Sequence, residues 1–192
     1  MIKNIMIVGV GGQGSLLASK ILGKAAMDAG YDVKVSEVHG MSQRGGSVVT
    51  YVRYGDEPVY SPVIGEGEAD VVLSFELLES ARWLPCLKIG GTVVTSIQQI
   101  NPMPVITGAA EYPTELVEKM RALAVDIRAY DTQSIAREAG NERASNVALM
   151  GLAADVLGFD EELLREAVAS CVPAKALEVN MKAYDAARAM IG

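Results

Sequence analysis

The chain has 192 residues, half of them hydrophobic but only 5% aromatic, which indicates a single domain with an aliphatic core. Its 24 Asp and Glu outnumber its 17 Lys and Arg and leave a net charge of −7, so nucleic-acid binding through phosphate neutralisation is not expected. Cys86 and Cys171 are too few for a disulfide framework or for the four thiolates that an iron–sulfur cluster usually needs. We therefore expect a cytoplasmic protein that binds no cluster alone.

The most apolar stretches predict neither a signal peptide nor a membrane span. Residues 5–8 form an apolar run that is far too short for a signal peptide, and glycines interrupt the next six residues. Residues 89–110 carry no charge, but Pro102 and Pro104 would lie inside any helix there. We expect no contact with a membrane.

The first 38 residues predict a strand, a glycine turn, a helix and a second strand. Residues 5–8 are continuously apolar, as in a parallel strand that is buried on both faces. Residues 15–29 carry an apolar stripe at helical spacing, and Gly30 stands where a helix stop is expected. Valines within 33–38 indicate the next strand. Together these elements predict one βαβ unit with a right-handed crossover.

Strands and helices continue to alternate along the rest of the chain. Residues 37–46 are polar and glycine-rich, so we expect a loop there, and the strand after so short a connection can run antiparallel. Further strands are expected at 47–54, 71–75, 92–97 (after a turn at Gly90 and Gly91) and around Ile127. Helices are expected at 76–87, 114–123 and 146–157. A further helix should begin after an N-cap at Asp160, and the last one after Pro173, with an ion pair between Glu178 and Lys182.

These elements predict an α/β fold with an open, mostly parallel, Rossmann-like sheet flanked by helices and a helical C-terminal portion. The helix at 146–157 is apolar nearly all round, with Asp155 as its only charge, and is expected to be buried. No repeat, low-complexity tract or linker divides the chain. We therefore expect residues 1–192 to form a single domain.

The sharpest local motif is the glycine turn between the first strand and the first helix. It consists of Gly9, Gly11, Gly12, Gln13 and Gly14, and matches G-x-G-x-x-G. Glycines let the backbone turn tightly and approach a ligand, and the helix after the turn presents free N–H groups to an anion. Glu37 lies where dinucleotide-binding proteins place a ribose-binding carboxylate. The motif fits a cofactor or anion loop and a turn needed only for helix–sheet packing about equally well.

A second polar segment joins the second and third strands. It consists of His39, Gly40, Met41, Ser42, Gln43, Arg44, Gly45 and Gly46. Open α/β sheets usually bind ligands at the carboxyl ends of strands, and an arginine beside glycines suits an anion or a partner surface. His39 is the only histidine and a weak candidate for proton transfer. The alternative is an ordinary connection in which the backbone satisfies His39.

Motifs of self-contained catalysts are missing from the sequence. It has no Gly-Asp-Gly run for thiamine diphosphate, no P-loop lysine, no Cys-x-x-Cys pair and no Gly-x-Ser-x-Gly elbow. No serine or cysteine nucleophile stands at the distance from His39 in the sequence that a known catalytic motif would require. A self-contained catalyst is hard to build from these residues.

Several longer segments are similar to the gamma-type domain of 2-oxoacid:ferredoxin oxidoreductases. The resemblance starts with GVGGQGSLLASKILGKAAMDAG and EVHGMSQRGGSVVTYVRYG, and the His-Gly-Met-Ser-Gln-Arg-Gly-Gly form of residues 39–46 points to the small (beta) subunits of the indolepyruvate branch. It continues through residues 69–85 and 101–113, Asn146 at the start of an apolar helix, and KALEVNMKAYDAA near the C-terminus. The resemblance therefore covers nearly the whole chain.

The resemblance implies a non-cofactor subunit of a larger enzyme. Enzymes of this family decarboxylate a 2-oxoacid on thiamine diphosphate, pass electrons through iron–sulfur clusters to ferredoxin and transfer the acyl group to coenzyme A. In the indolepyruvate branch the large alpha subunit is expected to carry the thiamine diphosphate and the clusters, with coenzyme A and ferredoxin reached through the complex. Two alternatives stay open, namely a free-standing NAD(P)-dependent oxidoreductase and a nucleotide-binding or structural module.

Overall fold

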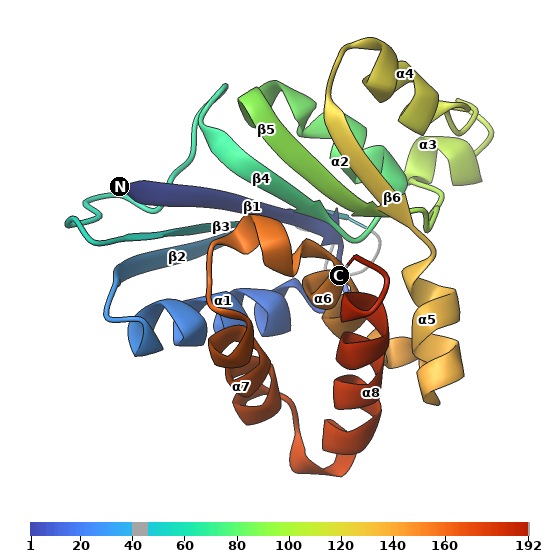
Figure 1. Ribbon diagram of the computed structural model, residues 1–192. Coiled ribbons are helices and arrows are strands. Elements are labelled where there is room, and N and C mark those ends of the chain that lie inside the picture. The colour runs from blue at the N-terminus through green and yellow to red at the C-terminus, as the bar shows by residue number, and fades with distance from the viewer. Residues whose placement is uncertain (40–45, 192) are drawn as a thin grey trace.

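The computed structural model describes residues 1–39 and 46–191, and these ranges form one six-stranded sheet flanked by helices (Figure 1). The strands are β1 (Ile2–Val10), β2 (Asp32–His39), β3 (Ser47–Gly55), β4 (Ala69–Ser74), β5 (Leu87–Ser96) and β6 (Asp126–Tyr130), in the order β2-β3-β1-β4-β5-β6. Parallel pairing joins β1 to β4, β4 to β5 and β5 to β6, whereas β3 runs antiparallel to both of its neighbours. The predicted open, mostly parallel α/β sheet is confirmed.

Helices cover both faces of the sheet and build two cores. The helices are α1 (Ser15–Asp28), α2 (Leu77–Arg82), α3 (Met103–Ile106), α4 (Leu116–Ala122), α5 (Thr132–Ala139), α6 (Ser145–Leu157), α7 (Glu161–Cys171) and α8 (Leu177–Arg188). Ile5 and Ile7 of β1 lie in the larger core, between the sheet and the helices α1 and α6. Met6 and Val8 lie in the smaller core on the opposite face, with α2 and α4 (Figure 1). Alternate side chains of a strand point to opposite faces, so this apolar run is buried on both sides as predicted.

An inserted strand modifies the expected βαβ unit. β2 follows β1 and α1 and runs in the same direction as β1, but β3 lies between the two strands. The antiparallel third strand is confirmed. The loop expected at residues 37–46 begins later than predicted. Pairing between β2 and β3 extends to His39 opposite Val48, so residues 37–39 belong to the strand.

Two predicted boundaries after β4 are wrong for local reasons. The helix expected at residues 76–87 ends at Arg82, and a 3-10 turn at residues 84–86 leads directly into β5. Pro85 has no N–H to donate to a continuing helix. The turn at Gly90 and Gly91 instead lies inside β5, where the register against β4 shifts. Gly90 has a left-handed φ of 80°, which suits the irregular backbone of a bulge.

The C-terminal half contains the predicted helices. α6 is buried along nearly its whole length, Asp160 caps α7 by accepting from the amides of Glu162 and Leu163, and Lys182 pairs with Glu178 at 2.7 Å. Helix α5 was not predicted. Its N-cap Asp131 accepts a hydrogen bond from the amide of Ser134, a signal that the sequence did carry.

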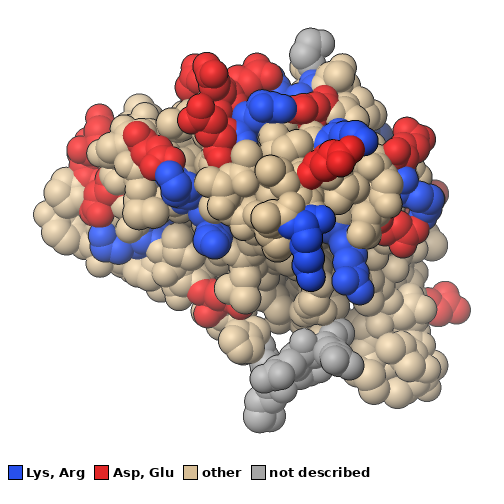
Figure 2. Space-filling view, turned by 90° about the horizontal axis from the view of Figure 1, so that it is seen from below, with Lys and Arg blue, Asp and Glu red and all other residues tan. Residues whose placement is uncertain are grey.

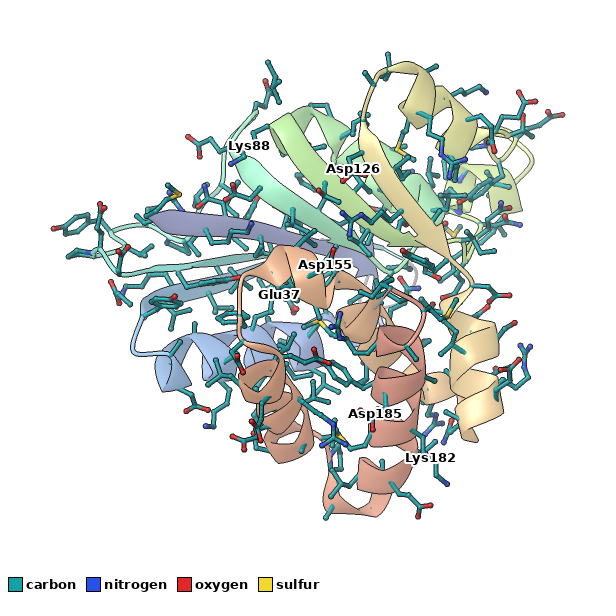
Figure 3. The ribbon with its side chains drawn as sticks, in the orientation of Figure 1. Glu37, Lys88, Asp126, Asp155, Lys182 and Asp185 are labelled. Atoms are coloured by element: carbon teal, nitrogen blue, oxygen red, sulfur yellow. The ribbon has the colours of Figure 1, made fainter. Side chains whose placement is uncertain are left out.

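On the face shown in Figure 2, acidic and basic side chains are mixed rather than separated into patches of one sign. The face in Figure 2 shows acidic and basic groups next to one another, as expected from pairs such as Arg165–Asp185 at 2.9 Å and Arg188–Glu161 at 3.0 Å. Lys182 and Asp185 project from α8 in Figure 3, whereas Lys88 and Asp126 lie near the starts of β5 and β6. No helix in the described ranges is long and apolar enough to cross a membrane.

Two helical glycines allow a matched test of the packing. A Cβ on Gly151 of α6 would lie 2.8 Å from the carbonyl oxygen of Tyr184 in α8, whereas a Cβ on Gly23 of α1 would meet only Val35, at 3.8 Å. We expect Gly151→Ala to lower the free energy of unfolding by about 1–3 kcal/mol through overpacking. Gly23→Ala should be neutral or stabilise by up to about 1 kcal/mol, since alanine favours a helix. Urea unfolding of both variants checks this; equal effects would contradict the close approach of α6 and α8.

Candidate functional site

The glycine turn lies at the carboxyl edge of the parallel strands. β1 ends at Val10, α1 begins at Ser15, and Val8 pairs with Ser74 of β4, so the turn stands beside the end of β4. Helices leave β1 and β4 toward opposite faces of the sheet, as seen in Figure 1. This is the point at which open α/β sheets form a crevice for ligands.

Gly9, Gly12 and Gly14 of the turn differ in their steric surroundings. A Cβ on Gly9 would lie 2.9 Å from Oε1 of Gln13, and one on Gly14 would overlap Nδ2 of Asn146. Gly12 and Gly14 have φ values of 100° and 93°, in the left-handed region. Of these three, only Gly12 would leave its Cβ in open space. Gly9 and Gly14 therefore serve close packing, while the exposed backbone at Gly12 is the part of the turn that another molecule can approach.

Gln13 fixes the turn to the sheet. Its Oε1 accepts a hydrogen bond from the amide of Val10 at 2.7 Å. Its Nε2 donates to the carbonyl of Phe75 at 2.8 Å and to Oε1 of Gln98 at 2.9 Å. One side chain thus connects the carboxyl ends of β1, β4 and β5. The fully used amide makes Gln13 a positioning group rather than a free ligand-binding donor.

Asn146 and Gly14, which lie far apart in the sequence, are in contact. Asn146 lies in the first turn of α6, is only 8% exposed, and its Oδ1 accepts from the amide of Val147 at 2.8 Å. Its Nδ2 points at Gly14. The asparagine therefore sets how closely α6 approaches the start of α1.

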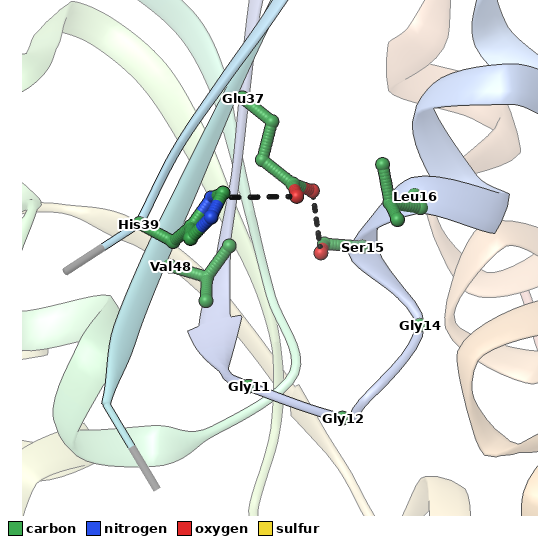
Figure 4. A pocket seen from close by; sticks show the side chains of 8 residues that line it. All are labelled: Gly11, Gly12, Gly14, Ser15, Leu16, Glu37, His39 and Val48. Atoms are coloured by element: carbon green, nitrogen blue, oxygen red, sulfur yellow. Dashed lines mark hydrogen bonds and ion pairs between the residues drawn. The ribbon is translucent and has the colours of Figure 1, made fainter. Parts of the chain in front are cut away.

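A hollow of about 410 Å³ lies on one side of the turn, with Glu37 at its wall (Figure 4). Oε2 of Glu37 accepts hydrogen bonds from Oγ of Ser15 at 3.0 Å and Oγ1 of Thr50 at 3.1 Å. Nδ1 of His39 lies 3.9 Å from the other carboxylate oxygen. Glu37 reaches the glycine turn as the dinucleotide pattern expects, and its Oε2 already accepts two hydrogen bonds from hydroxyl groups of the chain.

The structure describes only the two ends of the second predicted segment. Met41, Ser42, Gln43, Arg44 and Gly45, with Gly40, lie outside the described residues. His39 ends β2 with an exposed side chain, and the carbonyl of Gly46 accepts a hydrogen bond from the amide of Gly11 at 3.0 Å. The segment therefore starts and ends beside the glycine turn.

A second hollow, of about 490 Å³, lies on the other side of the turn. Polar side chains from the end of β5, from α5, from the 3-10 turn at residues 142–144 and from the start of α6 line it, among them Gln98, Gln133, Glu142, Arg143 and Asn146. Arginine and amide N–H groups can bind oxyanions, and the backbone of Gly12 borders this hollow as well. The hollow therefore combines one basic, one acidic and several amide side chains, which suit polar groups of a partner, although the sequence pointed to only part of this lining.

Two buried carboxylates at this edge were missed by sequence reasoning. Glu76 is 1% exposed and caps α2, and its Oε1 accepts from Tyr112 Oη at 2.6 Å and from the Ile100 amide at 3.0 Å. Glu79 is 4% exposed and accepts from Oγ of Ser47. Burial raises the pKa of Glu79 above its usual range, against the opposing effects of the Ser47 hydrogen bond and the Arg82 charge.

The described residues contain no group of three or more His, Cys, Asp and Glu side chains that could hold a metal. Cys86 belongs to the core on the α2 face, and Cys171 to the core on the α1 face. The sheet therefore separates the two thiols. They cannot ligate one cluster together, so an iron–sulfur centre does not fit the cysteines of this chain.

Residues 4–190 match the family model described as pyruvate ferredoxin/flavodoxin oxidoreductase. The chain belongs to this family. It is 45% identical over 200 residues to the indolepyruvate oxidoreductase subunit IorB of Thermococcus kodakarensis, covering 98% of each chain. The family member of that name from Pyrococcus horikoshii is 48% identical over 188 residues, covering 95% of this chain and 92% of the relative. Among solved structures, the pyruvate oxidoreductase subunit PORC of Thermotoga maritima shares the fold, with a TM-score of 0.73 at 21% identity, covering 98% of this chain and 96% of that chain.

The contact between Gly14 and Asn146 provides a direct test of the turn. Gly12→Ala should cost about 1–2 kcal/mol of unfolding free energy, because alanine is strained at a left-handed φ. Gly14→Ala should cost at least about 1 kcal/mol more, because its methyl group also meets Asn146. Adding Asn146→Ala to Gly14→Ala should recover that difference in urea unfolding. Equal losses for the two glycine variants, or no recovery, would show that the contact is not close.

Proposed function

We propose that this chain is the small subunit of an indolepyruvate:ferredoxin oxidoreductase, which oxidatively decarboxylates an arylpyruvate to an acyl-CoA and reduces ferredoxin. The observation that carries this proposal is the 45–48% identity, over almost the whole length, to proteins named as indolepyruvate oxidoreductase subunits. The whole chain, residues 1–192, would act as one gamma-type domain in a cytoplasmic complex.

In this proposal the large alpha subunit holds the thiamine diphosphate and the iron–sulfur clusters. The separation of Cys86 and Cys171 by the sheet supports this division, because it leaves the described chain without a cluster site. The sequence also lacks the motif expected for thiamine diphosphate. This chain would then contribute a binding surface for the large subunit, and the large subunit would contribute the reacting cofactors.

We propose that the carboxyl edge of the sheet faces the large subunit. The two hollows, the exposed backbone of Gly12 and both ends of the His39–Gly46 segment lie together there. Arg44 is the residue of that segment best suited to a phosphate of coenzyme A or a partner carboxylate, because its planar fork binds oxyanions through two hydrogen bonds. His39 is assigned an orienting role, with proton transfer as the lesser alternative.

The first test is an assay of the isolated chain and of the complex. The isolated chain should not reduce ferredoxin with indolepyruvate and coenzyme A, whereas addition of the large subunit should give a thiamine-dependent activity. Titration of the isolated chain with NAD(H) serves as the control for the dinucleotide alternative. Micromolar NAD(H) binding together with turnover by the isolated chain would overturn the subunit proposal.

A second test addresses Arg44. In the reconstituted complex, Arg44→Ala should raise the dissociation constant for the large subunit, or the KM for coenzyme A, by about 10- to 100-fold, the loss expected for one charge-assisted contact. Arg121→Ala removes an exposed arginine of α4 and is the matched control. If both constants of Arg44→Ala stay within about twofold of wild type, the segment is only a connection.

A further inference from the structure

Glu79 is a buried carboxylate for which packing alone gives no reason. It lies on α2 with 4% of its surface exposed. A carboxylate loses hydration when it is buried, so an apolar residue or an amide would fill the same space at lower cost. The contacts that the carboxylate makes should therefore explain why a charged group stands there.

The hydrogen bond of Glu79 reaches across to the beginning of β3. Oε2 accepts from Oγ of Ser47 at 2.5 Å, and Oε1 lies 3.5 Å from Nε of the half-exposed Arg82. Ser47 is the first residue of β3, directly after the His39–Gly46 segment. Glu79 thus ties α2, the helix that comes after β4, to the point where that segment re-enters the sheet.

The neighbouring residue makes the link to the glycine turn. The carbonyl of Gly46 accepts from the amide of Gly11, and Ser47 pairs with Val10 in the β1–β3 ladder. Residues 46 and 47 are therefore held from two sides, by the glycine turn and by Glu79. Among the contacts of the described residues, loss of the Glu79 hydrogen bond would leave the backbone of β1 and its turn to hold residues 46 and 47.

Glu76 offers a comparison at the start of the same helix. It is also buried, but it accepts from the backbone amide of Glu79 in the first turn of α2, from the Ile100 amide and from Tyr112, none of which belongs to the His39–Gly46 segment or to β3. Glu76 stabilises the fold around α2. Glu79 differs because its side-chain hydrogen bond leads to Ser47.

We propose that Glu79 is a positioning residue that holds Ser47 and Gly46 against the glycine turn, so that the carboxyl edge is presented to the large subunit in one arrangement. This inference rests on the proposed subunit function. It assigns Glu79 no contact with a reacting group. Glu79 acts through the hydrogen bond that its carboxylate oxygen accepts from Ser47.

The experiment uses the complex reconstituted with the large subunit, and compares Glu79→Ala, Glu79→Gln, Ser47→Ala and the double alanine variant. Glu79→Ala and Ser47→Ala should each raise the dissociation constant for the large subunit about 10-fold. The double variant should be no worse than Glu79→Ala alone, because both changes remove the same bond. Glu79→Gln should stay within about threefold of wild type, since its amide oxygen still accepts from Ser47.

The thermal midpoint of each isolated variant separates positioning from folding. Asp70→Asn, at the start of β4 and the opposite edge of the sheet, changes a carboxylate that accepts from the amide of Asn4 at 2.7 Å; it is the matched control and should lower the midpoint without changing the dissociation constant of the folded protein. If Glu79→Ala lowers only the midpoint, or if Glu79→Gln loses as much affinity as Glu79→Ala, the positioning role is wrong. Should Glu79→Ala not fold, Ser47→Ala decides the question, because unchanged affinity in that variant overturns the proposal. Failure of the wild-type chain to bind the large subunit would instead overturn the proposed function.

Discussion

The side chain of Gln13 joins the three strand ends on which the carboxyl edge depends. It bonds to the amide of Val10, the carbonyl of Phe75 and the side chain of Gln98, so the ends of β1, β4 and β5 have one common contact. The glycines around it are needed because a Cβ at Gly9 would strike this side chain and one at Gly14 would strike Asn146. The turn between β1 and α1 is therefore closely packed at both ends and accessible mainly at Gly12.

This arrangement explains why a glycine pattern typical of dinucleotide-binding proteins occurs in a ferredoxin-linked family. The glycine pattern reflects the tight, closely packed turn that the backbone makes between a buried strand and a helix, and this steric requirement is the same with or without a bound nucleotide. Glu37 is an example, because Ser15 and Thr50 of the chain donate hydrogen bonds to its Oε2. The inserted strand β3 supplies Thr50, so the topology of the sheet itself alters the chemistry of the motif.

Sequence patterns predicted the elements whose position depends mainly on burying apolar side chains. The run at residues 5–8 had to be a strand buried on both faces, and the apolar helix at 146–157 had to be buried. The position of β3 between β1 and β2 could not be predicted, because it depends on pairing between residues far apart in the chain. The contacts of Asn146 with Gly14 and of Glu79 with Ser47 were missed for the same reason: each joins distant segments, and no local spacing encodes it. Residues 40–45 stay a prediction, since they lie outside the described residues.

We propose that this chain acts only as part of a larger oxidoreductase and contributes binding surface rather than cofactors. The most direct measurement is indolepyruvate- and coenzyme A-dependent reduction of ferredoxin by the isolated chain, by the isolated large subunit and by the two together. We expect full activity only for the combination, with thiamine diphosphate and iron–sulfur clusters recovered in the large subunit alone. Full activity of the large subunit without this chain, or clusters bound by this chain, would contradict it.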